Sequence, residues 1–153
     1  VPLVFSWPGH IVEDCTSTAL TELIDIAPTL LEASGIEVPY FMQGKSLLPI
    51  LRGNEDNRFH KNVVLSEFHD SCNYNEGSGP PTHSVMSFDG RYKMITYRGY
   101  EFGELYDLQN DPEEFYDLWD SCSHKDLKLK VMHQHVSAIM SSISSGPHRS
   151  TRY

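Results

Sequence analysis

The first part of the chain shows apolar runs that end at turn residues. The segment from Leu3 to Trp7 is apolar and aromatic and stops at Pro8-Gly9, which predicts a buried strand followed by a turn. Farther on, apolar residues recur at helical spacing from Ile26 to Ser34. Asp25 stands before this segment as a predicted N-cap and Gly35 follows it as a stop, so a helix is predicted here.

A shorter helix is predicted over Leu47 to Leu51, with Ser46 as its cap. The charged loop from Asn54 to Lys61 follows it. We expect this region to separate two structural units, residues 1–52 and residues 53–153.

The pattern then changes to strands separated by turns. Val63 to Phe68 and Glu104 to Leu108 each predict a strand. Two further strands, Ser84 to Phe88 and Arg91 to Tyr97, flank Asp89-Gly90. An Asp-Gly pair supplies the positive φ angles of a tight turn, so these two strands are predicted to form an antiparallel hairpin.

The last strong element is a helix from about Ser123 to Ile143, whose apolar residues recur at helical spacing. We expect it to cover one face of the sheet, which gives an α+β fold: a small antiparallel sheet packed against a C-terminal helix. Three of its side chains are expected to be buried: Leu127, Val131 and Ile139. Lys128 and His135 are expected to be largely exposed.

Composition and charge narrow the possible partners. The chain has 153 residues, 39% of them hydrophobic, and a formal net charge of -9. Nucleic-acid binding needs clustered Lys and Arg, so it is not expected. No apolar run approaches ~20 residues, and we expect no membrane span. The three cysteines, Cys15, Cys72 and Cys122, allow one disulfide with at least one thiol left over, which leaves the redox compartment open.

Three segments occur in an order that is typical of one family. The first is Val1 to Gly9; the second is Leu23 to Ile36 with its Asp-x-x-Pro-Thr sequence, continued by Gly-x-Ser-Leu from Gly44 to Leu47; the third is Glu104 to Glu114, Glu-Leu-Tyr-Asp-Leu-Gln-Asn-Asp-Pro-Glu-Glu. Together they resemble the C-terminal portion of the sulfatase family, within the alkaline-phosphatase-like superfamily. The resemblance implies that residues 1–52 end an α/β catalytic domain and that residues 53–153 form a small C-terminal subdomain.

The same resemblance implies a parent enzyme that hydrolyses sulfate esters. Family members mature a Cys or Ser in Cys/Ser-x-Pro/Ala-x-Arg to formylglycine and bind a divalent metal, usually calcium, through Asp and Asn. These residues are expected upstream of the segment that resembles Val1 to Gly9. The implied partners are the rest of the parent catalytic domain and, through it, a sulfate-ester substrate. We therefore expect no catalytic residue and no metal ligand in this chain and no activity from the chain alone, and we leave open a secreted, periplasmic or lysosomal compartment.

Two short segments imitate the catalytic motifs. Ser145 to Arg149 reads Ser-x-Pro-x-Arg but follows the last helix in a polar tail. Asp56-Asn57 imitates the metal-binding dipeptide but lies in a charged loop without a strand before it. We interpret both as chance matches.

The candidates for contact with a substrate lie around one long loop. Glu67 and His69 come at the end of a predicted strand, and His83 closes the Gly- and Ser-rich loop from Asp70 to Pro81. These three side chains could face the cleft of an intact sulfatase and contact a sulfate or sugar group. An exposed polar loop is the simpler alternative. His133 and His135 are two positions apart on a helix, so we do not expect them to share a metal.

Five tyrosines allow two interpretations: Tyr92, Tyr97, Tyr100, Tyr106 and Tyr116. They could form a platform for sugar stacking, but their positions favour packing against the final helix.

Two other functions stay open at this point. One is the same region of a phosphodiesterase or phosphonate hydrolase of the same superfamily, and the other is a non-enzymatic accessory module.

Overall fold

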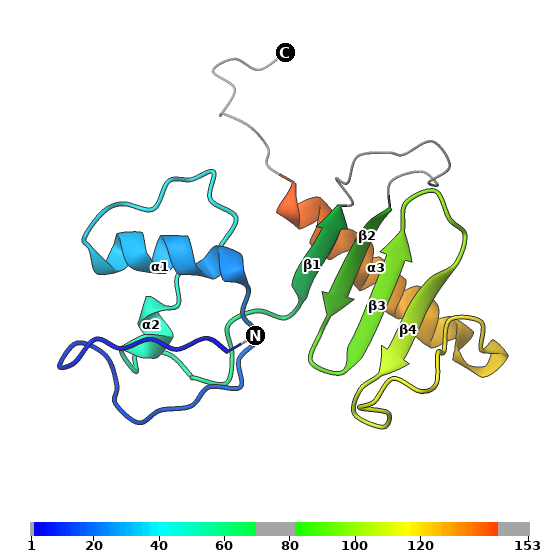
Figure 1. Ribbon diagram of the computed structural model, residues 1–153, viewed down its shortest axis with the longest axis horizontal. Coiled ribbons are helices and arrows are strands. Elements are labelled where there is room, and N and C mark those ends of the chain that lie inside the picture. The colour runs from blue at the N-terminus through cyan, green and yellow to red at the C-terminus, as the bar shows by residue number, and fades with distance from the viewer. Residues whose placement is uncertain (1, 70–81, 144–153) are drawn as a thin grey trace, which may run out of the picture. The chain divides into compact units, whose positions relative to one another are not determined.

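The computed structural model describes residues 2–69 and 82–143, which fall into two compact units (Figure 1). The first unit includes the residues up to Asn62, and the second spans Val63–Ile143. The charged loop of residues 54–61 belongs to the first unit. No helix in the described part of the chain is both long and apolar enough to cross a bilayer.

The first unit is built on three short helical segments. A 3₁₀ turn, η1 (Leu23–Asp25), leads directly into α1 (Ile26–Ala33), and α2 (Leu48–Leu51) follows after a connecting loop. The two predicted helices are confirmed. Their buried side chains form a small core: Pro28, Thr29, Leu47, Leu48 and Ile50.

Asp25 is the polar anchor of this unit. It stands at the predicted N-cap position of α1, but its carboxylate makes no hydrogen bond that caps this helix, and its backbone is already helical, with φ −78° and ψ −16°. Instead the carboxylate accepts hydrogen bonds from the backbone N–H of Glu22 at 2.9 Å and of Lys45 at 2.8 Å. Lys61 Nζ lies 2.6 Å from the same carboxylate. A fully buried charge needs such partners, and here they tie η1 to the loop before α2.

The spacing inside the Asp-x-x-Pro-Thr segment has a structural explanation in this unit. Thr29 Oγ1 donates to the Asp25 carbonyl at 2.5 Å and accepts from the Leu47 N–H at 2.8 Å, so both residues fix the start of α2. The loop passes so close that a Cβ on Gly44 would lie 1.9 Å from the Ile24 carbonyl oxygen. Only glycine fits there.

The predicted buried strand over Leu3 to Trp7 is wrong for this structure. These residues are not in a strand, and Val4 is 85% exposed. A strand needs a neighbour to take its backbone hydrogen bonds, and the described part of the first unit contains no strand that could pair with it.

The second unit is a four-stranded antiparallel meander. Its strands are β1 (Val64–His69), β2 (His83–Phe88), β3 (Tyr92–Tyr97) and β4 (Gly103–Asp107), and they lie in the order β1-β2-β3-β4. Both ends of all four strands were predicted to within one residue.

The predicted tight turn at Asp89-Gly90 is confirmed. Gly90 has φ +95°. The Asp89 side chain fixes the turn, because its Oδ1 accepts from the N–H of Arg91 at 2.9 Å and of Tyr92 at 2.7 Å.

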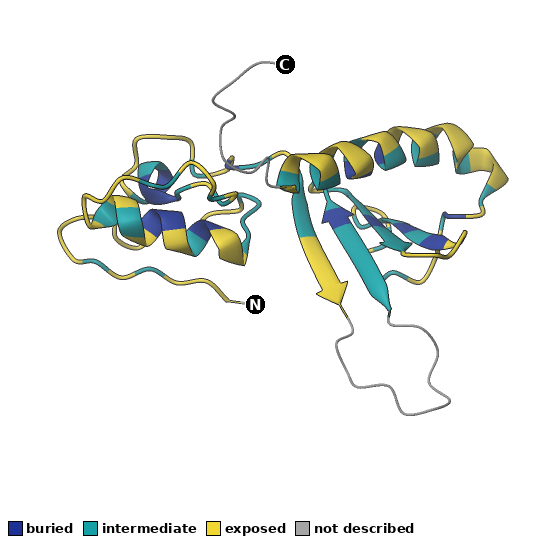
Figure 2. Cartoon of the chain, turned by 90° about the horizontal axis from the view of Figure 1, so that it is seen from above, coloured by how far each residue is buried: buried dark blue, intermediate teal, exposed yellow. Residues whose placement is uncertain are grey.

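The helix α3 (Lys125–Ser142) lies along one face of this sheet (Figure 2). The α+β fold class is therefore confirmed. The core under the helix is formed by four buried side chains: Met94, Leu105, Trp119 and Val131. The ring of Trp119 packs so tightly on β4 that a Cβ on Gly103 would lie 2.5 Å from it.

Which side chains of α3 are buried differs from the prediction. Val131 is buried as expected, but Leu127 and Ile139 are only partly buried. His135, expected to be exposed, is 1% exposed, because it lies one helical turn after Val131 on the same face. Lys128 is partly buried, since its Nζ donates to the Trp119 carbonyl at 2.9 Å and sits 3.8 Å from the centre of that ring.

The imidazole of His135 is held between two strands. Its Nδ1 lies 2.7 Å from Ser87 Oγ on β2, and its Nε2 lies 2.8 Å from Thr96 Oγ1 on β3. Burial lowers the pKa of His135, because a charged ring would lose its hydration there. The helix is thus fixed to the sheet by a neutral polar group inside the core.

Candidate functional site

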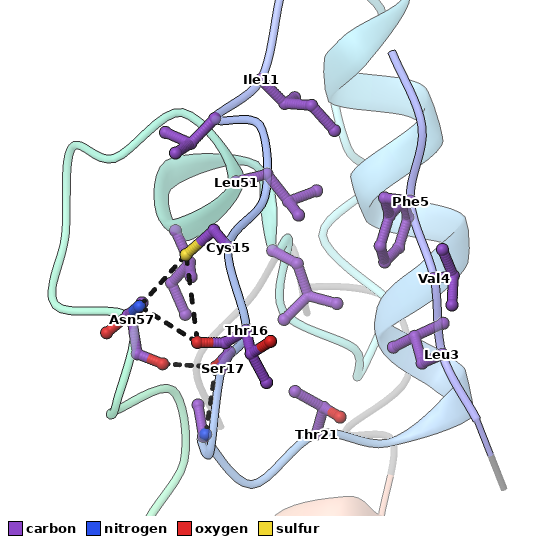
Figure 3. Close-up of a pocket in the computed structure, with 14 residues that line it drawn as sticks. Leu3, Val4, Phe5, Ile11, Cys15, Thr16, Ser17, Thr21, Leu51 and Asn57 are labelled. Atoms are coloured by element: carbon purple, nitrogen blue, oxygen red, sulfur yellow. Dashed lines mark hydrogen bonds between the residues drawn. The ribbon is translucent and has the colours of Figure 1, made fainter. Parts of the chain in front are cut away.

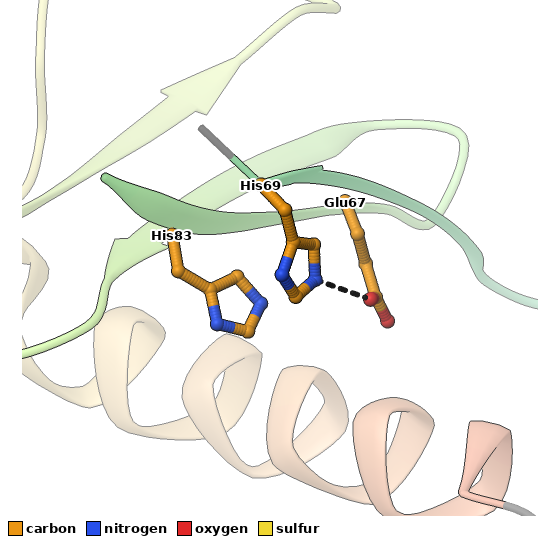
Figure 4. Close-up of side chains that lie close together, drawn as sticks. All are labelled: Glu67, His69 and His83. Atoms are coloured by element: carbon orange, nitrogen blue, oxygen red, sulfur yellow. Dashed lines mark hydrogen bonds and ion pairs between the residues drawn. The ribbon is translucent and has the colours of Figure 1, made fainter. Parts of the chain in front are cut away.

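The three predicted cleft residues, Glu67, His69 and His83, lie together on one face of the sheet (Figure 4). We call them the Glu-His-His cluster. The register of the sheet brings them together: His69 on β1 is the direct cross-strand partner of His83 on β2. Glu67 precedes His69 by two residues and therefore points to the same face.

The side chains of the cluster contact one another. The rings of His69 and His83 have their centres 3.6 Å apart, and Glu67 Oε2 lies 3.3 Å from His69 Nε2. The side chains of His69 and Glu67 are 59% and 43% exposed, so solvent reaches the cluster. His83 is less exposed, and its Nε2 is buried without a hydrogen-bond partner among the described residues.

The sequence prediction named these residues as neighbours of one loop, and the structure shows that they share one side-chain cluster. Their contact with a substrate stays a prediction. The loop residues from Asp70 to Pro81 lie outside the described part of the chain.

A second polar group lies on the opposite face of the sheet. Tyr97 and Tyr106 both donate a phenolic hydrogen bond to Glu104, the latter at 2.9 Å. The bond to Glu104 and burial together raise the pKa of Tyr97 to about 12. The pKa of Tyr106 is also raised, first by burial and then by its bond to Glu104. Both phenols stay protonated at neutral pH and act as fixed donors.

The five tyrosines differ in whether they pack against the final helix, as the sequence predicted. Tyr92 packs against the core beneath α3 as predicted. For Tyr97 and Tyr106 the prediction of packing against the final helix is wrong, because β3 and β4 alternate sides and place them on the other face. Tyr100 and Tyr116 are 50% and 74% exposed, so the prediction is wrong for them as well.

A hollow of about 490 Å³ lies in the first unit (Figure 3). Its wall is mainly apolar and includes Phe5, Ile11 and Leu51, and none of the residues that line it is charged. Its polar atoms bind one another: Asn57 Nδ2 donates to Cys15 Sγ at 3.2 Å, and Ser17 Oγ donates to the Asn57 carbonyl. It offers a mainly apolar surface, and the thiol of Cys15 that lines it accepts the hydrogen bond from Asn57.

The Asp56-Asn57 dipeptide, which imitates a metal-binding motif, does not fit a calcium site. Asp56 is paired with Arg58, whose Nε lies 3.2 Å from Oδ1, and this pair lowers the pKa of Asp56. The side-chain amide of Asn57 donates hydrogen bonds to Cys15 Sγ and to the Thr16 carbonyl. The dipeptide is therefore a turn with its own partners. The imitation motif at Ser145 to Arg149 lies outside the described residues, as does Cys72, while Cys15 and Cys122 are free thiols.

Sequence reasoning missed one buried histidine, His60, which is 3% exposed in the first unit. Its Nε2 lies 3.4 Å from Asp25 Oδ2, and burial lowers its pKa despite the nearby carboxylate. Its position in a charged loop suggested that it is exposed. That loop has no periodic pattern of apolar residues that could have indicated burial.

Comparison with known proteins agrees with this fold and these motifs. The sequence profile described as N-sulphoglucosamine sulphohydrolase, C-terminal, matches residues 1–141, and the chain belongs to this family of sulfatase C-terminal regions. The N-acetylglucosamine-6-O-sulfatase of Bacteroides thetaiotaomicron is 28% identical over 86% of this chain and 23% of its own length. The resemblance to sulfatases noted from the sequence is confirmed.

Two solved structures show the same architecture. One is described as a putative sulfatase from Bacteroides thetaiotaomicron. It is 31% identical in sequence, superposes with a TM-score of 0.64, and the match covers 77% of this chain and 24% of that chain. The other is a phosphonate monoester hydrolase from Silicibacter pomeroyi. It is 26% identical in sequence, superposes with a TM-score of 0.72, and the match covers 91% of this chain and 28% of that chain. The chain thus spans about a quarter of the length of the proteins it matches.

Proposed function

We propose that this chain is the C-terminal part of a sulfuric ester hydrolase, and that its own role is to support the active site and line the substrate cleft. The observation that carries the proposal is the family match over residues 1–141. The buried Asp25 anchor and the sheet with its covering helix are structural features, which suits a supporting role.

Formylglycine and calcium belong to this proposal only through the parent enzyme. Because the Asp56-Asn57 turn does not fit a calcium ion, we assign both groups to the remainder of the parent protein. The rest of the catalytic domain is then the main partner of this chain, and the chain alone is inactive.

The Glu-His-His cluster is the proposed contribution of this chain to the cleft. Glu67 would repel a sulfate group and would instead accept a hydrogen bond from a sugar hydroxyl. The imidazole of His69 can donate or accept, depending on its tautomer. This combination suits the hydroxyl-bearing part of a sulfated sugar better than the sulfate group itself.

The phosphonate monoester hydrolase likeness keeps a second function open. That structure covers 91% of this chain at a TM-score of 0.72, so the C-terminal fold alone does not separate the two reactions. An accessory module without enzymatic activity is the third possibility.

One pair of assays tests these alternatives. The purified 153-residue chain is expected not to hydrolyse 4-nitrophenyl sulfate with or without calcium, whereas the full-length parent protein is expected to do so. A parent that hydrolyses a phosphonate monoester and leaves the sulfate intact would favour the alternative. Activity on neither would favour the accessory module.

The cleft role is tested in the full-length protein with His69→Ala. We expect KM for a sulfated sugar to rise more than KM for 4-nitrophenyl sulfate, which has no sugar hydroxyls. His133→Ala, an exposed histidine on α3, is the matched control and should change neither. Equal KM values for wild type and His69→Ala on the sulfated sugar would exclude the proposed contact.

A further inference from the structure

The Glu-His-His cluster has the composition and spacing of a site for a divalent transition metal. Two imidazole nitrogens and one carboxylate oxygen offer donor atoms that all lie within 4.8 Å of one another. Imidazole with carboxylate suits zinc and its neighbours in the first transition row, whereas calcium prefers a shell of oxygen atoms alone. We propose that Glu67, His69 and His83 bind one divalent ion of the zinc class.

The backbone supplies most of the geometry. Directly opposed residues on antiparallel strands have Cβ atoms about 4.5–5.5 Å apart, and residues two apart on one strand share a face. His69 and His83 are such an opposed pair, and Glu67 is the residue two before His69. The register of β1 and β2 therefore places the Cβ atoms of the three residues together on one face, and the rotamers present bring the donor atoms within reach of one another.

The donor distances are close to those a metal requires. With zinc–ligand bonds of about 2.0–2.2 Å, donors at tetrahedral angles lie about 3.4 Å apart. Glu67 Oε2 and His69 Nε2 are already 3.3 Å apart. The widest separation in the cluster, up to 4.8 Å, must shorten by about 1.4 Å to reach the same value, which rotation of a side chain can provide.

The hydrogen bonding and exposure of the three side chains also favour metal binding. The buried Nε2 of His83 has no hydrogen-bond partner in the described part of the chain, and such a group is costly unless something binds it. The exposed side chains of Glu67 and His69 give an ion access from solvent. Three protein ligands leave at least one position of the ion for water, as in open zinc sites.

The test is titration of the untagged 153-residue chain with Zn²⁺, and separately with Co²⁺, whose visible absorption reports nitrogen and oxygen coordination. We expect one Zn²⁺ per chain, a higher midpoint of thermal unfolding for the second unit, and no such effect from Ca²⁺. His69→Ala is expected to weaken Zn²⁺ binding by at least about tenfold, as is Glu67→Gln. Both side chains are exposed, so neither change should impair folding.

His133→Ala serves as the control because His133 is exposed on α3 and does not belong to the cluster. It should leave the Zn²⁺ affinity unchanged. The proposal is overturned if the chain shows no saturable Zn²⁺ binding, or if His69→Ala and His133→Ala bind Zn²⁺ equally well. The readouts need no enzymatic activity, so a failure here would not affect the sulfatase proposal.

Discussion

Replacing His135 with leucine removes the polar link between α3 and the sheet while keeping a side chain of similar size. The change deletes two hydrogen bonds, of 2.7 Å to Ser87 Oγ and of 2.8 Å to Thr96 Oγ1. Ser87 is 4% exposed, so its hydroxyl would be left without water or a partner. An unsatisfied buried group costs about 1–3 kcal/mol, and Thr96, only partly buried, adds less. We expect the free energy of unfolding of the second unit to fall by about 2–4 kcal/mol.

The same substitution should flatten the pH dependence of stability. Burial lowers the pKa of His135 in the folded protein, while in the unfolded chain it stays near about 6.5. Below that pH the unfolded state binds more protons than the folded state, so wild-type stability falls as the pH drops from about 6.5 toward the folded pKa. Leucine cannot titrate, and its variant should lose this part of the slope.

Urea unfolding followed by the fluorescence of Trp119, in a Trp7→Phe background, reports the second unit. His133→Leu is the matched control, since this exposed neighbour should change stability by less than about 0.5 kcal/mol. The triple variant His135→Leu, Ser87→Ala, Thr96→Val should recover much of the loss, because it removes the orphaned hydroxyls as well. A His135→Leu protein with wild-type stability and an unchanged pH profile would refute the reasoning.

Three further substitutions test the packing of the second unit by thermal unfolding. Val131→Asp should cost about 3 kcal/mol or more, because it places an unpaired carboxylate among buried apolar side chains; a small shift would mean that the helix does not pack as described. Gly90→Val should cost about 1 kcal/mol from backbone strain at φ +95°, with Gly90→Asn milder; equal midpoints for all three proteins would count against the turn. Gly103→Ala should cost about 1–3 kcal/mol, since its Cβ would meet the Trp119 ring at 2.5 Å. Gly99→Ala, at an open position with φ +81°, should show only the backbone strain of about 1 kcal/mol, and a loss at Gly103 no larger than this would count against the close packing of Trp119.

The strands and helices of this chain were predictable because their signals are local. The Asp89-Gly90 turn specifies its hairpin through two adjacent residues, and the apolar spacing before Gly35 specifies α1. The prediction of a strand at Leu3 to Trp7 failed for the opposite reason. A strand needs a neighbouring strand to pair with, and the residues of this segment do not reveal whether such a neighbour is present.

The errors on individual side chains have a common physical origin. His135 and Asp25 are polar, and polarity alone suggested exposure or a local cap. Each is buried because partners distant in sequence satisfy it: Ser87 is 48 positions from His135, and Lys45 is 20 positions from Asp25. The Glu-His-His cluster was predicted as a set of candidates, but its spacing followed only from the register of β1 and β2.

The order of the strands also has a consequence for how the second unit folds. Each strand of the meander pairs with the next one along the chain, and the β2–β3 and β3–β4 pairings close short loops and lose little chain entropy. Contacts between α3 and the sheet, such as those of His135, span 39 and 48 positions and close far longer loops. We therefore expect the β2–β3 hairpin, whose strands are joined by residues 89–91, to form first and the helix to dock on it afterwards. Substitutions in that turn should slow folding, whereas the loss of His135 should mainly accelerate unfolding.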